Sequence, residues 1–257
     1  MPEYDFPQLD NPAWYSLTGA HAQHAVGGPI GTVRALRYDP EVSVWGATPD
    51  DATADDWAAL GALLGADESI SLPGRELPEG WEGDGGLGLQ LIDEDYEPQP
   101  GDGEGLVTLT AEDVPEMIDL VERTQPGPFA PRTIELGGYV GVRVDGKLVA
   151  MAGRRMNPAG WVEISAVCTD EEHRGRGYAA RLVRAVASGI RADGQRAFLH
   201  VRWDNYDAKR VYERLGFVVR REFPFSFGRP AAGDQAGERP GVQPAEGNEQ
   251  TERDTAA

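Results

Sequence analysis

One segment, residues 163–179, constrains the fold of this chain more than any other. Its sequence, EISAVCTDEEHRGRGYA, passes from an apolar strand through an acidic loop into a glycine turn that opens a helix. The first N–H groups of a helix lack partners and lie at the positive end of its dipole, so such a turn is suited to bind phosphate. A tight turn that binds no ligand is the alternative. If the turn binds phosphate, the binding residues would be Arg174, Gly175, Arg176 and Gly177.

The second half of the chain predicts a mixed α/β sheet. Asp145-Gly146 between two apolar runs is a strong hairpin signal, and strands then alternate with amphipathic helices. Thr110, with Asp113 three residues later, is predicted to cap the first of these helices. Strands are predicted at residues 139–144, 148–154, 162–169, 197–202 and 217–227, and helices at 110–122, 177–191 and 204–215.

The chain is predicted to divide into an acidic α/β half (1–105), a second unit (106–227) and a disordered tail (228–257). Residues 1–105 hold 21 acidic and 3 basic side chains, and they end in an acidic stretch, 93–105, which is rich in Pro and Gly and reads as a linker or exposed loop. The tail contains one sizeable apolar residue, Val242. In the first half, helices are predicted at 11–25 and 53–64, and strands at 32–38, 42–48, 68–72 and 87–92.

Composition excludes several classes of function. The formal charge of −19 disfavours nucleic-acid binding, which needs a basic face. No apolar run approaches the roughly 18 residues of a membrane span, and the N-terminus does not read as a signal peptide, so we expect a cytoplasmic protein that does not bind membranes. Cys168 is the single cysteine, and His21 and His24 have no third ligand spaced with them, so no metal site is expected.

Two motifs together resemble the GNAT superfamily of N-acetyltransferases. Residues 174–179, RGRGYA, fit its Arg/Gln-x-x-Gly-x-Gly/Ala motif, and Asn205, Ala208 and residues 212–217, YERLGF, resemble the second half of the signature. The resemblance covers residues 106–227. It implies the GNAT fold, a mixed and mostly antiparallel sheet flanked by helices, and the first half is compatible with a degenerate GNAT-like lobe that shapes the acceptor pocket.

The resemblance also implies acetyl-CoA as co-substrate and indicates the residues that hold it. Backbone groups of Val167, Cys168 and Thr169 would bind the pantetheine arm, and Asn205 would contact the pantetheine or the nearby backbone. The pyrophosphate would lie against Arg174, Gly175, Arg176, Gly177, Tyr178 and Ala179.

Three residues are predicted to carry the chemistry. Tyr212 corresponds to the superfamily's tyrosine near the thioester sulfur, and a phenol with a pKa of about 10 can protonate a departing thiolate. Glu163 and His200 are alternative general bases, because each stands where one branch of the superfamily has its glutamate base; either would act directly or through a water chain. Strand alternation predicts that Glu163, Ser165, Val167 and Thr169 share one face.

We therefore expect direct transfer of an acetyl group from acetyl-CoA to a primary amine of a small-molecule or peptide acceptor, by a monomer or homodimer. Two alternatives are a non-catalytic acyl-CoA-binding or regulatory module and a transferase that uses another acyl-CoA. The acidic half is expected to be a solvated surface, with steering of cationic acceptors as the competing interpretation.

Overall fold

The computed structural model describes residues 4–30 and 33–231, which form one large and one small sheet. All neighbours in the large sheet are antiparallel except β9 and β10, so the predicted mixed, mostly antiparallel sheet is confirmed. In spatial order its strands are β4 (Ile70–Pro73), β11 (Val218–Pro230), β5 (Trp81–Ile92), β10 (Arg196–Arg202), β9 (Trp161–Thr169), β8 (Lys147–Arg154), β7 (Tyr139–Val144) and β6 (Val107–Leu109).

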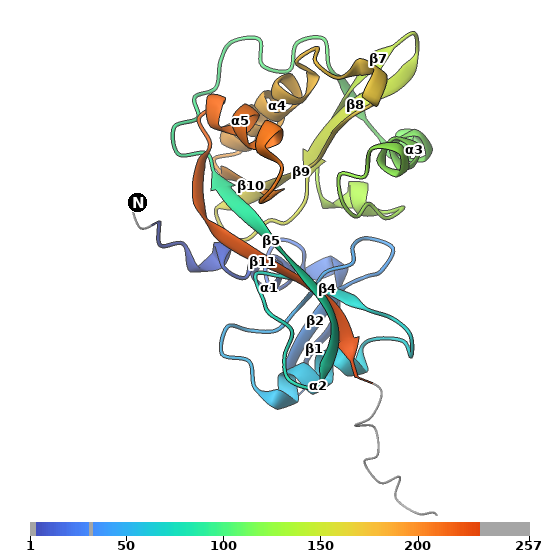
Figure 1. Cartoon of the computed structure of the whole chain (residues 1–257), viewed down its shortest axis with the longest axis vertical. Coiled ribbons are helices and arrows are strands. Elements are labelled where there is room, and N and C mark those ends of the chain that lie inside the picture. The colour runs from blue at the N-terminus through green and yellow to red at the C-terminus, as the bar shows by residue number, and fades with distance from the viewer. Residues whose placement is uncertain (1–3, 31–32, 232–257) are drawn as a thin grey trace, which may run out of the picture.

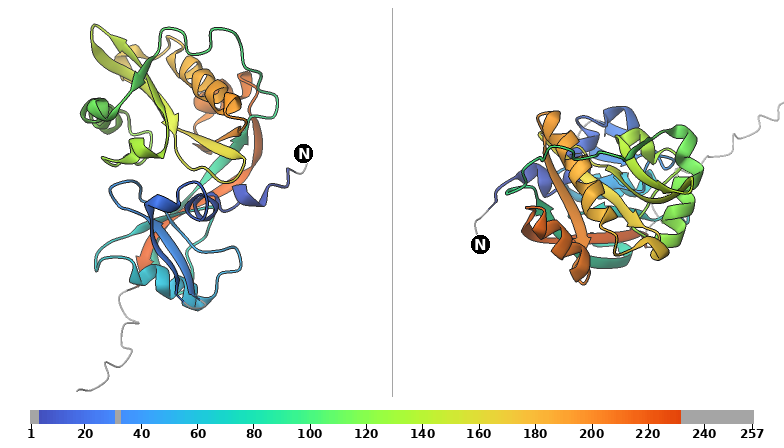
Figure 2. Two further views of the ribbon diagram at one scale, coloured as in Figure 1. Left: turned by 180° about the vertical axis from the view of Figure 1, so that it is seen from behind. Right: turned by 90° about the horizontal axis from the view of Figure 1, so that it is seen from above.

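Helices cover both faces of the large sheet at one end of the molecule (Figure 1). The apolar stripe of α4 (Tyr178–Ala192) is buried against β7 to β10, and α5 (Tyr206–Arg214) contacts α4. On the other face α3 (Val114–Thr124) packs on β8 and β9, and these strands lie between α3 and α4 in Figure 2. The predicted capping box of Thr110 and Asp113 is confirmed, at a short turn that precedes α3.

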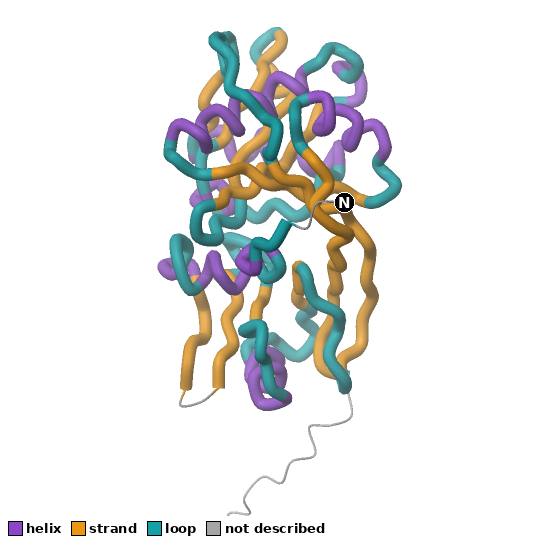
Figure 3. Tube along the Cα trace, turned by 90° about the vertical axis from the view of Figure 1, so that its left-hand side faces the viewer, coloured by secondary structure: helices purple, strands orange, loops and turns teal. Residues whose placement is uncertain are grey.

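The small sheet lies at the opposite end of the molecule and is joined to the large one. The long strands β5 and β11 extend from the helix-covered end to this end (Figure 3). An isolated bridge between Trp45 and Ser71 links the region of β3 to β4. The predicted boundary at position 105 therefore divides the large sheet. In this sheet β4 and β5 come before position 105 in the chain, and the other six strands come after it. The elements at this end are β1 (Ala25–Ile30), β2 (Val33–Tyr38), β3 (Gly46–Ala47), α1 (Pro12–Leu17) and α2 (Ala54–Ala62).

Short 3-10 helices connect several of these elements. They span Pro7–Leu9, Ala22–His24, Ala111–Asp113, Thr133–Leu136 and Glu171–His173.

Several predictions for the first half are wrong in extent. The helix predicted at 11–25 ends at Leu17, the strand predicted at 42–48 shrinks to two residues, and β1 is not predicted at all. In the structure β5 begins at Trp81 rather than at residue 87, although residues 82–86, EGDGG, have low strand propensity. Pairing with β11 holds this stretch, and a Cβ at Gly83 would lie 2.1 Å from the Phe227 carbonyl oxygen, so the close approach requires glycine.

Residues 93–105 form a mostly exposed loop, as their composition predicts, but this loop is attached to the fold at several points and is not a free linker. Asp93 and Tyr96 are buried, and an oxygen of Asp93 accepts a hydrogen bond of 2.8 Å from the Ala197 amide. Asp102 accepts hydrogen bonds from Ser188 and Arg184 on α4. The carboxylates that suggested exposure therefore fasten this segment to α4 and β10.

Part of the predicted disordered tail belongs to the fold, because β11 continues to Pro230. Residues 232–257 of that tail lie outside the described residues. Among the helices that the structure describes, none is long and apolar enough to cross a membrane.

Candidate active site

The sheet opens where β9 and β10 diverge. The two parallel strands pair only from Trp161 to Ile164 on β9 and from Arg196 to Leu199 on β10. Beyond this point β9 continues to Thr169, and none of the described residues pairs with it on the β10 side. The predicted pantetheine ligands Val167, Cys168 and Thr169 lie on this stretch of β9, where Cys168 and Thr169 are paired with Met151 and Ala150 of β8 along the other edge.

A β-bulge at Ala166 interrupts the opposite edge of β9. On that side Ser165 pairs with Gly153 and Cys168 pairs with Met151, so β9 contains one extra residue. Ala166 has a φ of +53°, and this left-handed conformation costs a non-glycine residue roughly 1–2 kcal/mol. A bulge leaves its extra residue unpaired in the ladder, and this one lies two residues beyond Ile164, the last residue of β9 that pairs with β10.

The bulge corrects the prediction that Glu163, Ser165, Val167 and Thr169 share a face. One extra residue reverses the alternation, which places Cys168 on the side of Glu163 and Ser165. Consistent with this reversal, Cys168 packs in the cluster beneath α3, whereas Val167 packs against the cluster beneath α4.

The glycine turn has the form that the sequence predicts. Gly175 and Gly177 have φ of +75° and +77°, and no side chain among the described residues caps the N-terminus of α4 at Gly177. Arg174 and Arg176 are exposed, and within the described part of the chain each donates only to a backbone carbonyl, at 3.3 and 3.4 Å, so both charges can reach an anion. Tyr178 and Ala179 form the first turn of α4 behind them.

A cavity of about 620 Å³ adjoins this turn. It extends from Gly177 along Ala180, Arg181 and Arg184 to the loop at residues 101–105. The turn therefore borders a space large enough for part of an extended ligand.

Tyr212 and Asn205 both belong to α5 or its cap. Burial raises the pKa of Tyr212 to about 12, so the phenol stays protonated and can donate a proton. Its ring is only 7% exposed and packs in the same apolar cluster as Val167. The side-chain oxygen of Asn205 accepts from the Ala208 amide at 3.1 Å, which leaves its amide nitrogen available to donate.

Glu163 lies in a buried ion pair. Its carboxylate accepts hydrogen bonds of 2.8 and 2.6 Å from Nε and Nη2 of Arg155, and it lies 2.7 Å from Nδ1 of His200. Burial acts to raise the pKa of Glu163, but Arg155 and His200 outweigh burial and hold it well below its usual value. With no exposed surface, the ionised carboxylate cannot contact an acceptor directly.

The hydrogen bonds of Gln90 define the tautomer of His200. Arg220 can only donate, so the Gln90 atom 2.7 Å from it is the amide oxygen. The amide nitrogen of Gln90 then donates to the Leu9 carbonyl at 2.8 Å and to Nε2 of His200 at 3.0 Å. The proton of His200 therefore lies on Nδ1, facing Glu163. Burial lowers the pKa of His200 despite Glu163, so the ring is neutral near pH 7.

Sequence reasoning missed Arg155, Gln90 and Arg220. Arg155 had a local signal, because it follows β8 and Glu163 lies near the start of the next strand. Gln90 and Arg220 had none, because β5 and β11 bring them together from distant parts of the chain. Across the described residues, no group of three or more His, Cys, Asp or Glu side chains is placed to hold a metal ion.

Comparisons with known proteins agree with this geometry. Residues 139–225 match a family model described as FR47-like protein, while no curated protein matches the chain. Among solved structures, an acetyltransferase from the GNAT family of Novosphingobium aromaticivorans is 38% identical with a TM-score of 0.80, and the match covers 89% of this chain and 100% of that chain.

Two more distant structures show the same fold. A GCN5-related N-acetyltransferase from Kribbella flavida is 22% identical with a TM-score of 0.58 over 87% of this chain and 96% of that one. A Drosophila protein is 15% identical with a TM-score of 0.55 over 89% and 91%. From the identity to the Novosphingobium protein over nearly the whole chain, together with the opened sheet and the glycine turn, we conclude that this protein belongs to the GNAT family and is an acyltransferase.

Proposed function

We propose that this acyltransferase moves an acetyl group from acetyl-CoA directly to a primary amine of a small-molecule or peptide acceptor. The observation that carries the proposal is the sequence of features along β9: the opening beside β10, the bulge at Ala166 and the glycine turn before α4. Together they offer a backbone edge, donors for an oxyanion and an anion cradle along one path.

Acetyl-CoA would bind along this path. The amide groups of the pantetheine would pair with the free edge of β9, much as an added strand pairs with a sheet edge. Asn205 has an amide nitrogen that can donate to the same arm. The residues proposed to hold the co-substrate are Val167, Cys168, Thr169, Arg174, Gly175, Arg176, Gly177, Tyr178, Ala179 and Asn205.

In the proposed reaction the amine nitrogen of the acceptor attacks the thioester carbonyl. Backbone N–H groups at the bulge would stabilise the oxyanion. The C–S bond then breaks, and Tyr212 donates its proton to the departing thiolate. Burial raises the pKa of the Cys168 thiol to about 11, so it is a poor nucleophile, which supports direct transfer without a covalent enzyme intermediate.

The amine must lose a proton before or during attack. Because the side chains of Glu163 and His200 are buried and bonded to each other, we propose that they receive this proton through a water chain rather than by contact. The single lone pair of the neutral His200 ring accepts from Gln90, so proton uptake there requires this bond to break.

Calorimetric titration with acetyl-CoA, followed by an acceptor screen, tests the proposal. We expect saturable binding at one site per chain. In Tyr212→Phe the affinity for acetyl-CoA should be nearly unchanged, while kcat falls by about 10²–10⁴-fold, the usual contribution of a positioned acid. An unaltered kcat with several good acceptors would remove Tyr212 from the reaction.

The burial of both candidate bases favours a second candidate, an acyl-CoA-binding or regulatory module without turnover. Binding of acetyl-CoA without transfer to any amine, amino acid, polyamine or peptide would support it. Comparison of acetyl-CoA with propionyl-CoA and longer thioesters defines the acyl preference. We further propose that the protein acts in the cytoplasm as a monomer or homodimer, which gel filtration with light scattering can distinguish.

A further inference from the structure

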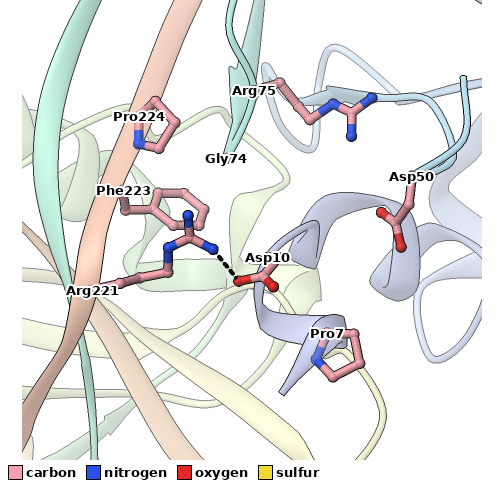
Figure 4. Close-up of a pocket in the computed structure, with 8 residues that line it drawn as sticks. All are labelled: Pro7, Asp10, Asp50, Gly74, Arg75, Arg221, Phe223 and Pro224. Atoms are coloured by element: carbon pink, nitrogen blue, oxygen red, sulfur yellow. Dashed lines mark hydrogen bonds and ion pairs between the residues drawn. The ribbon is translucent and has the colours of Figure 1, made fainter. Parts of the chain in front are cut away.

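A second cavity lies on the far side of β5 from the opening between β9 and β10. It has a volume of about 320 Å³, near the lower limit of small-molecule pockets, which span roughly 300–1,000 Å³. The N-terminal segment, two loops of the first half and β11 enclose it (Figure 4). Its lining residues are Pro7, Asp10, Asp50, Gly74, Arg75, Arg221, Phe223 and Pro224.

One charge of each sign on this lining lacks an ion-pair partner among the residues that the structure describes. Arg75 donates only to the Pro49 carbonyl, at 3.3 Å, and its guanidinium lies 5.4 Å from the centre of the Trp57 ring. Asp50 accepts hydrogen bonds of 2.8 Å from Asn11 and from Tyr15, which orient its carboxylate but do not neutralise it.

A second carboxylate on the lining keeps one oxygen available. Arg220 and Arg221 both donate to Oδ1 of Asp10, each at 2.7 Å, and Oδ2 makes no hydrogen bond within the described part of the chain. The cavity therefore offers a cation, Arg75, and two carboxylates, Asp50 and Asp10, that can accept from a ligand. The rings of Pro7, Phe223 and Pro224 add an apolar wall.

The cavity is separate from the proposed site of acyl transfer. The strand β5 lies between β10 and β11, so β10 and β11 are about 10 Å apart. The ring of Phe223, which is 1% exposed, packs 4.2 Å from the ring of His200 and stands between the cavity and that residue. A ligand in the cavity is thus kept away from a thioester bound beside β9.

We propose that this cavity binds a zwitterionic α-amino acid with a small aliphatic side chain. The carboxylate of the ligand would pair with Arg75, and its ammonium group with Asp50 and Oδ2 of Asp10. The aliphatic side chain would lie against the proline and phenylalanine rings. A lining with equal numbers of arginines and aspartates matches a ligand that carries both charges better than it matches an anion or a polyamine.

Titration of the full chain with L-alanine, L-valine and L-leucine, in the absence of acetyl-CoA, tests the proposal. We expect saturable binding of at least one of them at one site per chain. Two analogues of valine each lack one charge: 3-methylbutanoate has no amine and 2-methylpropylamine has no carboxylate. Each should bind at least about tenfold more weakly, because hydrogen bonds to charged groups contribute about 1.5–3 kcal/mol.

Matched variants assign the binding to this cavity. Arg75→Gln and Asp50→Asn should each weaken amino-acid binding at least about tenfold. The controls Arg229→Gln and Asp51→Asn remove surface charges of the same type elsewhere and should leave the affinity unchanged. No binding of any of the three amino acids, equal affinity for 3-methylbutanoate, or full affinity in Arg75→Gln would each overturn the proposal. Because no thioester is present, these outcomes do not depend on the proposed acyl transfer.

Discussion

Glu163 shows how the neighbours of one side chain determine its charge. Burial acts to raise its pKa from 4.5, but Arg155 and His200 outweigh burial and lower it to about 2. A carboxylate whose pKa is depressed by folding stabilises the protein above its unfolded-state pKa, and this contribution is lost as the pH falls through the folded-state pKa. The contribution of Glu163 is therefore complete near pH 7 and declines from about pH 4.5 toward pH 2.

The variant Glu163→Gln tests this at the scale of one residue. It leaves the buried Arg155 without a counter-charge, so we expect a loss of about 3–5 kcal/mol in the free energy of unfolding at pH 7. Urea titrations measure the free energy of unfolding at pH 7 and at pH 3.5. The difference in this free energy between the variant and the parent protein should be smaller at pH 3.5. The exposed Glu171, changed to Gln, is the control and should alter neither value. An equal difference at both pH values would mean that Glu163 is not ionised in the fold.

Ala166 carries a second prediction at this scale. Glycine adopts a φ of +53° without the Cβ penalty of roughly 1–2 kcal/mol, which exceeds the roughly 0.4–1 kcal/mol that glycine costs through the entropy of the unfolded chain, so Ala166→Gly should raise the free energy of unfolding by up to about 1 kcal/mol. Ala166→Val should lower it and should reduce kcat, because a β-branched residue displaces the backbone donors at the bulge. Ala152→Gly on the neighbouring strand β8 is the control, and it should destabilise. If Ala166→Gly lowered the free energy of unfolding as much as Ala152→Gly, the bulge at Ala166 would not be strained.

At the scale of elements, α2 depends on one buried carboxylate. Asp56 accepts from the Thr53 amide at 2.8 Å in a capping box, and also from the Arg34 amide on β2 at 2.6 Å. The same side chain therefore caps the helix and fastens it to the small sheet.

Replacing Asp56 by Ala should lower the free energy of unfolding by about 1–3 kcal/mol, because two buried amide donors lose their acceptor. Asp55→Ala, one residue earlier in the same turn and exposed, should change stability by less than about 0.5 kcal/mol. Chemical denaturation of both variants measures the difference. If both variants lost the same free energy of unfolding, the negative charge near the helix N-terminus, rather than the hydrogen bonds of Asp56, would account for the stabilisation.

Elements of the second half were predictable because their signals are local. The hairpin around Asp145-Gly146 forms as predicted, with φ of +51° and +82° at these two residues. The cap at Thr110 and the apolar stripe of α4 are likewise encoded within a few residues. In the first half, residues 87–92 of β5 were predicted, but the glycine-rich start of this strand, residues 81–86, depends on pairing with β11, more than 120 residues away, and carries no local sign of a strand.

For the whole molecule, the shared sheet predicts that neither half folds alone. A fragment of residues 106–231 would lack β5, which pairs with β10 on one side and β11 on the other. We expect this fragment to show no cooperative thermal transition by circular dichroism. The control, a chain that ends at Ala231, keeps all eight strands of the large sheet and should unfold in one transition that different probes report alike. A cooperative transition in the isolated fragment would contradict the shared sheet.

Local features of this protein follow from its sequence alone: the glycine turn, the amphipathic helices, the hairpin and the succession of strands along the second half. Each depends on backbone preferences and spacings within a short stretch of chain. Long-range contacts, by contrast, place the bulge at Ala166, bury Glu163 and His200 against Arg155 and Gln90, and let β5 join the two halves. The physical reason is that strand register, desolvation and ion pairing depend on which distant segments come into contact, and no short sequence window contains both partners.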